Sequence, residues 1–151
     1  MAHTPLILTF KKYQPEDLDA MMALWRASTV VAHDFQSADE LDRDEDLIRN
    51  KYIAQTETWV AREGEQMVGF ISLVGTLIVA LFVDASRHRA GIGSALLAHV
   101  ISLHGPLGVE VFPENTNGVA FYQKHGFKKV REEENALYPS HPHWIMEQKP
   151  K

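Results

Sequence analysis

The sequence contains no cysteine among its 151 residues. This absence excludes a disulfide-stapled scaffold, a thiolate metal site and a cysteine nucleophile. A chain of this length hides roughly 68 to 70% of the surface that its unfolded form would expose, so its hydrophobic core needs no covalent or metal support. We therefore expect one domain that covers residues 1–151.

Positive charge is also scarce. Fifteen Lys and Arg residues against twenty Asp and Glu give a net charge of −5, which argues against a dedicated nucleic-acid or anionic-membrane binder. The uncharged stretch of residues 68–83 is interrupted by Gly69, Ser72, Gly75 and Thr76, so it reads as two buried strands joined by a turn and not as a membrane helix. The amino terminus lacks the basic flank and apolar core of a signal peptide, so we expect a cytoplasmic protein.

Hydrophobic periodicity predicts alternating strands and helices. Ser37 with Glu40 forms a capping box for a helix that runs to Tyr52. The apolar spacing from Ile92 to Leu103 predicts a crossover helix between two parallel strands, and the whole order favours a mixed sheet packed by helices. The predicted strands cover 6–12, 57–62, 67–74, 77–83, 108–112, 127–131 and 144–147, and the helices begin near Pro15, after Ser37, at Ile92 and at Asn115.

Residues 81–97 form a buried strand, a glycine-spaced turn and an amphipathic helix. Gly91 and Gly93 let the backbone approach a ligand closely, and the first N–H groups of the helix suit a pyrophosphate. The same residues also fit a tight strand-to-helix turn that binds no ligand. Two nucleotide motifs do not fit, because a P-loop requires a lysine where Ser94 stands and a dinucleotide fingerprint requires Gly or Ala where Leu96 stands.

Two segments together resemble the GNAT superfamily of N-acetyltransferases. Residues 88–93 are similar to its Gln/Arg-x-x-Gly-x-Gly/Ala motif, and residues 115–127 are similar to its Asn-x-x-Ala-x-x-Phe-Tyr-x-Lys-x-Gly-Phe motif. His88, Arg89 and Gly118 depart from the usual residues. The resemblance extends over nearly the whole chain and implies an α/β (α+β) fold: a single mixed, mostly antiparallel sheet of about seven strands with a splayed parallel central pair, flanked by about four helices.

The resemblance also implies an activity. It is the transfer of an acetyl group from acetyl-CoA, as cosubstrate, to a primary amine by direct attack and without a metal. The acceptor stays open among a protein lysine, a protein amino terminus and a small amine. The alternatives are a CoA-binding regulatory module that has lost turnover and a nucleotide-binding protein. By resemblance, the coenzyme is assigned to Leu81, Phe82, Val83, His88, Arg89, Ala90, Gly91, Ile92, Gly93, Ser94 and Asn115.

Two residues are candidates for proton transfer. Tyr122 aligns with the tyrosine that protonates the departing thiolate in many family members, and a core aromatic residue is the alternative reading. A phenol with a reference pKa of about 10 is protonated at neutral pH, so the chemistry is reasonable. Glu110 stands mid-strand among apolar residues, where family members place a base for the amine. A strand residue that faces solvent is its alternative.

The loop after the first helix is expected to shape the acceptor pocket. His33 and Asp34 are the candidate substrate contacts there, and His33 rivals Glu110 as the base because an imidazole transfers protons near neutrality. A structural histidine is the alternative. His141 and His143 lack the partners of a complete metal site, so surface or structural roles are favoured for them. Asn115, assigned to the coenzyme by resemblance, also fits a helix N-cap. The chain is expected to be a monomer or a homodimer.

Overall fold

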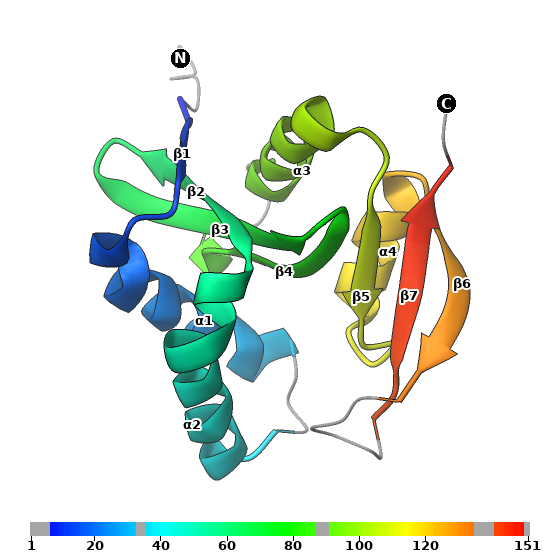
Figure 1. Ribbon diagram of the computed structural model, residues 1–151, viewed down its shortest axis with the longest axis horizontal. Coiled ribbons are helices and arrows are strands. Elements are labelled where there is room, and N and C mark those ends of the chain that lie inside the picture. Colours follow the sequence, from blue (N-terminus) through cyan, green and yellow to red (C-terminus); the bar gives the residue numbers. More distant parts are fainter. Residues whose placement is uncertain (1–6, 33–35, 87–90, 135–140, 150–151) are drawn as a thin grey trace.

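Seven strands form one sheet in the order β1-β2-β3-β4-β5-β7-β6 in this computed structural model, which describes residues 7–32, 36–86, 91–134 and 141–149 (Figure 1). The strands are β1 (Thr9–Lys12), β2 (Glu57–Glu63), β3 (Gln66–Val74), β4 (Leu77–Val83), β5 (Gly108–Val111), β6 (Phe127–Glu133) and β7 (His143–Gln148). The helices are α1 (Leu18–Ala32), α2 (Ala38–Leu47), α3 (Ile92–His104) and α4 (Thr116–Lys124), with short turns η1 (Pro15–Asp17), η2 (Ile48–Tyr52) and η3 (Ile53–Gln55).

The centre of the sheet is the parallel pair β4 and β5. Their ladder covers only Leu77 with Gly108 and Ile78 with Val109, after which the two strands diverge. The other neighbouring strands in the described part of the chain pair antiparallel. This topology confirms the predicted mixed sheet with a splayed parallel central pair.

A β-bulge marks the point of divergence. Ser72 on β3 pairs with Ala80, whereas the next residue, Leu73, pairs with Ile78, so Val79 is an extra residue on β4. A bulge bends its strand and re-aims the neighbouring side chains and N–H groups. This bulge lies at the position where β4 leaves β5, and it therefore contributes to the opening between them.

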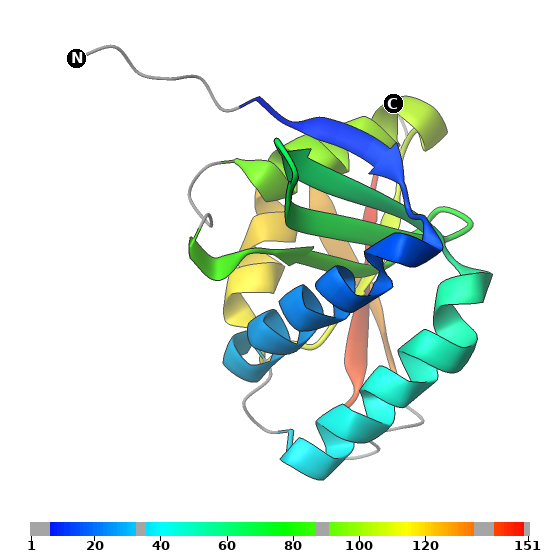
Figure 2. The same cartoon turned by 90° about the vertical axis from the view of Figure 1, so that its left-hand side faces the viewer.

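Helices cover both faces of the sheet. One buried cluster joins α3 and α4 to the sheet, with Leu96, Val100 and Phe127 among its members. A second cluster joins α1 and α2 to the opposite face around Trp25 and Phe70. Figure 2 shows α1 and α2 together on the near side of the sheet. The first cluster extends from β2 to β6, whereas the second covers only the part of its face formed by β2, β3 and β4.

Some predicted boundaries differ from the structure. The capping box of Ser37 and Glu40 forms as predicted, but α2 ends at Leu47 and continues as a π-helical turn and then a 3₁₀ turn. Leu103 is exposed while Val100 is buried, so the buried apolar face of α3 ends at Val100, although His104 still contacts Glu57 of β2. No helix within the described ranges is long and apolar enough to cross a membrane.

Candidate active site

The divergence of β4 and β5 opens a cleft of about 110 Å³. Leu81 and Phe82, which the resemblance assigned to the coenzyme, line it from β4, and Val111 lines it from β5. Beyond Ile78 the β5 side of β4 has no strand ladder, so its backbone groups are available to a ligand that lies along the strand. Val83 pairs with Gly69 on β3 and accepts a hydrogen bond from Ser28 Oγ at 3.3 Å.

Tyr122 reaches the same cleft from α4. Its side chain is buried, and its ring packs edge-on against Phe121 and Phe127, with centroid distances of 5.2 and 5.3 Å. Burial raises the pKa of Tyr122 well above its ordinary value of 10.0, so the phenol keeps its proton at neutral pH. The two readings of this residue are compatible, because the ring belongs to the core and also borders the cleft.

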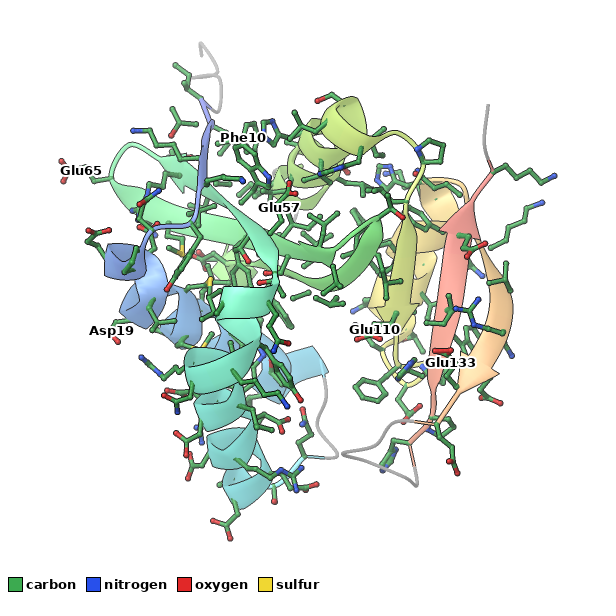
Figure 3. All side chains as sticks on the ribbon, in the orientation of Figure 1. Phe10, Asp19, Glu57, Glu65, Glu110 and Glu133 are labelled. Atoms are coloured by element: carbon green, nitrogen blue, oxygen red, sulfur yellow. The ribbon has the colours of Figure 1, made fainter. Side chains whose placement is uncertain are left out.

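Glu110 faces the cavity side of β5, whereas its neighbours Val109 and Val111 are buried in the opposite layer. Figure 3 shows its side chain projecting from β5 toward the half of the molecule formed by β1–β4. Burial raises the pKa of Glu110, and the charge of Glu133 raises it further, while the nearby His143 lowers it. A carboxylate with a raised pKa is a stronger base than one in water.

The glycine turn opens α3 as the sequence predicts. Gly91 is the N-cap residue and adopts a left-handed conformation with φ of 78°, which a residue with a side chain rarely adopts. Ser94 Oγ lies 3.0 Å from Nε2 of His125, at the end of α4. The first N–H groups of α3 form the positive end of the helix dipole, which suits an anion such as a pyrophosphate, and a Cβ at Gly93 would lie 3.6 Å from Val83 at the end of β4.

Asn115 is the N-cap of α4. Its Oδ1 accepts a hydrogen bond from the N–H of Gly118 at 3.0 Å, which confirms the N-cap interpretation. The side chain also borders the cleft, so the predicted contact with the coenzyme stays open. The predicted site residues His33, Asp34, His88, Arg89 and Ala90 lie outside the described residues.

A larger cavity of about 520 Å³ adjoins the cleft on the side of α1 and η2. Its walls are mostly apolar, and the hydroxyl of the buried Thr29 has no hydrogen-bond partner among the described residues. The cavity and the cleft share residues, so the two spaces are continuous. The shared residues are Val79, Ala80, Phe82, Glu110, Phe112 and His143.

Sequence reasoning missed the place of His143. The side chain is 14% exposed, lies 3.5 Å from Glu110 and borders both spaces, so it is not a surface histidine. The missed signal is the start of β7, which was predicted one residue too late. With the strand begun at His143, alternation places this residue on the face of Ile145, which pairs with Glu110.

Within the described ranges, no three His, Asp or Glu side chains could hold a metal ion.

Four features together define the acetyltransferase class that the two motifs indicated. They are a splayed parallel strand pair, a buried tyrosine and a carboxylate with a raised pKa at its opening, and a helix that begins after a glycine cap. Three comparisons bear on this assignment. Residues 54–129 match the family described as an acetyltransferase (GNAT) domain. The peptidyl-lysine N-acetyltransferase YiaC of Escherichia coli (strain K12) is 34% identical over 140 residues, which cover 90% of this chain and 93% of YiaC.

Solved structures agree with this match. The solution structure of apo-form YjaB from Escherichia coli has a TM-score of 0.85 and 30% sequence identity, with 96% of this chain and 99% of that chain covered. The crystal structure of the PaiA N-acetyltransferase from Thermoplasma acidophilum in complex with coenzyme A has a TM-score of 0.78 at 18% identity, with 95% and 99% covered. The chain belongs to the GNAT family and is an acetyltransferase, so the silent regulatory module is not favoured.

Proposed function

We propose that the protein transfers an acetyl group from acetyl-CoA to the side-chain amine of a protein lysine. The observation that carries the proposal is the single opening between β4 and β5, which Tyr122 and Glu110 both border. One group can donate a proton to the leaving thiolate while the other accepts a proton from the incoming amine. The relatives named peptidyl-lysine N-acetyltransferases support the acceptor class.

The residues present fit acetyl-CoA as a substrate. The open edge of β4 offers backbone N–H and C=O groups to the pantetheine arm, and the N-terminus of α3 behind Gly91 offers N–H groups and a positive dipole to the pyrophosphate. Asn115 and Ser94 offer polar side chains near these elements. A backbone N–H toward the end of β4, near Val83, is the candidate that polarises the thioester carbonyl.

The larger cavity fits the acceptor. Trp25, Phe70 and Phe82 give it apolar walls against which the aliphatic stem of a lysine can pack, and Glu110 lies where the cavity joins the cleft. A lysine ammonium with a reference pKa of about 10.4 has no lone pair, so it must lose a proton before it attacks. Glu110 takes this proton, and the neutral amine attacks the thioester carbonyl directly. Tyr122 then protonates the thiolate that leaves.

Purified protein incubated with acetyl-CoA and lysine-containing peptides tests the proposal. Mass spectrometry is expected to find one acetyl group on the lysine Nε, with thiol release at the same rate. Acetylation of peptide amino termini or of small amines alone would overturn the acceptor class. Tight coenzyme binding without acetyl transfer to any peptide, amino terminus or small amine would overturn the reaction itself.

A further inference from the structure

His143, the first residue of β7, lies between two carboxylates that come from two other strands. Its Nε2 is 3.5 Å from Glu110 Oε2 on β5 and 3.7 Å from Glu133 Oε1 on β6. The strand register explains this arrangement, because His143 pairs with Glu133 while Glu110 pairs with Ile145, two residues further along β7. Residues two apart on a strand share a face, so the three side chains gather on one side of the sheet.

The surroundings hold the imidazole in place. The side chain of His143 is 14% exposed, and its ring lies edge-on to that of Phe112, with a centroid distance of 6.4 Å. Glu133 is more exposed and also contacts Arg131, whose Nε lies 3.1 Å away. The imidazole therefore lies between the more exposed Glu133 and Glu110 at the cavity, and Figure 3 labels both carboxylates.

Other titratable groups face Glu110 across the two spaces. Asp44 of α2 and Tyr52 of η2 border the larger cavity, and Tyr122 of α4 borders the cleft. The residues of β4 that face Glu110 are apolar. Among the described groups on these elements, His143 is the one that can place a positive charge within 4 Å of the Glu110 carboxylate. The burial of Glu110 and the negative charge of Glu133 both favour the protonated form of Glu110, and the charge of His143 has the opposite effect.

We infer that His143 is a positioning residue for the base, because its imidazole, which lies between Glu133 and Glu110, holds the Glu110 carboxylate at the cavity and, when it carries a proton, favours the ionised form of that carboxylate. This inference rests on the proposed function. When the acceptor loses its proton, an N–H bond of the ammonium breaks, an O–H bond forms on Glu110, and the electron pair left on nitrogen attacks the thioester carbonyl. The imidazole of His143 takes no part in this proton transfer, so it acts only through the position and the ionisation of Glu110.

Two substitutions at one position separate charge from shape. His143→Gln keeps a polar side chain of similar reach but removes the positive charge, whereas His143→Lys keeps a positive charge in a different shape. The acid limb of the kcat/KM profile is expected to move to higher pH in His143→Gln by roughly 1 unit or more, the size of effect that an adjacent opposite charge has on a carboxyl. In His143→Lys the limb is expected to stay at or below its wild-type position. KM for acetyl-CoA is expected to stay constant in both variants.

The matched control is His104→Gln, which removes a comparable contact between His104 Nε2 and Glu57 Oε2, at 2.9 Å, away from the cleft. This control is expected to leave the pH profile unchanged. A loss of activity that is equal at every pH in both His143 variants would overturn the inference, because it would indicate a structural role alone.

A readout without catalysis keeps the inference separate from the proposed function. The ¹³C resonance of the Glu110 carboxyl, assigned by its absence in Glu110→Gln, is followed against pH in the wild-type protein and in His143→Gln. Titration at higher pH in His143→Gln supports the inference, and an unmoved titration overturns it. If the wild-type protein acetylates no amine, the proposed function fails, and this titration still decides the role of His143.

Discussion

The amide of Asn115 occupies the space that a side chain at Gly118 would need. A Cβ at Gly118 would come within 2.5 Å of Asn115 Nδ2, while the N–H of Gly118 donates to Asn115 Oδ1 at 3.0 Å. A side chain at residue 118 would therefore require the Asn115 amide to move from this position. The departure of Gly118 from the family pattern leaves room for this cap.

Gly118→Ala is expected to give no net gain in the free energy of unfolding, because the gain in helix propensity is offset by the loss of the cap, worth typically about 1 kcal/mol. In the Asn115→Ala background there is no cap to lose. There the same substitution is expected to stabilise the protein by about 0.5 to 1 kcal/mol. Urea unfolding of the four proteins checks this, and an equal gain in both backgrounds would contradict it.

Tyr122→Phe removes the proposed proton donor and keeps the buried ring. We expect kcat to fall by roughly 10²- to 10⁴-fold, the usual contribution of general acid–base catalysis, while the Kd for acetyl-CoA changes little. Steady-state kinetics and calorimetry measure the two quantities. Tyr13→Phe, in a partly buried tyrosine that packs against the α1–α2 cluster, is the control. Turnover that is unchanged in Tyr122→Phe would remove the assigned role.

Glu110→Gln tests the base through pH. Because burial raises the pKa of Glu110 above its ordinary value of 4.5, the carboxylate is lost as pH falls through this raised value. Wild-type activity is therefore expected to decline at a higher pH than an ordinary carboxyl would impose. The variant is expected to lose this limb, and its remaining activity should rise toward the pKa of lysine, about 10.4. Glu147→Gln, at an exposed position on β7, should keep the wild-type profile.

Gly91→Ala tests the turn before α3. The left-handed conformation at φ of 78° is expected to cost an alanine about 1 to 2 kcal/mol of stability, and the shifted N–H groups should weaken acetyl-CoA binding. Gly75, with φ of 62° in the turn between β3 and β4, is the matched control, because an alanine there would be strained in the same way but away from the turn before α3. Gly75→Ala should lower Tm similarly and leave the Kd for acetyl-CoA unchanged. Equal loss of affinity in both variants would count against the role of Gly91.

Thr29→Val tests the wall of the larger cavity. The Thr29 hydroxyl is buried without a partner among the described residues, and such a group costs about 1 to 3 kcal/mol. Valine is expected to raise Tm for this reason. Ser28→Ala, which removes the hydrogen bond to Val83, is expected to lower it. A lower Tm in Thr29→Val would show that the hydroxyl has a partner in solution.

Local patterns were sufficient for most of the fold. Apolar alternation located the strands within a few residues, and Ser37 with Glu40 located the start of α2, because caps and periodicity act over a single turn. Tyr122 and Glu110 could be chosen as candidates because the family resemblance assigns functions to their positions in the sequence. The exposure of Leu103 could not be predicted, because it depends on which distant elements the fold packs against the end of α3.

The sequence by itself determined the elements of this protein, the left-handed glycine before α3 and the family to which its motifs point, since each of these depends on residues a few positions apart. Only the tertiary structure decided that His143 meets Glu110 and Glu133, and that a cavity beside α1 opens onto the cleft between β4 and β5. The reason is physical: strand register and crossover connections set which distant side chains share a face, and no local pattern specifies them.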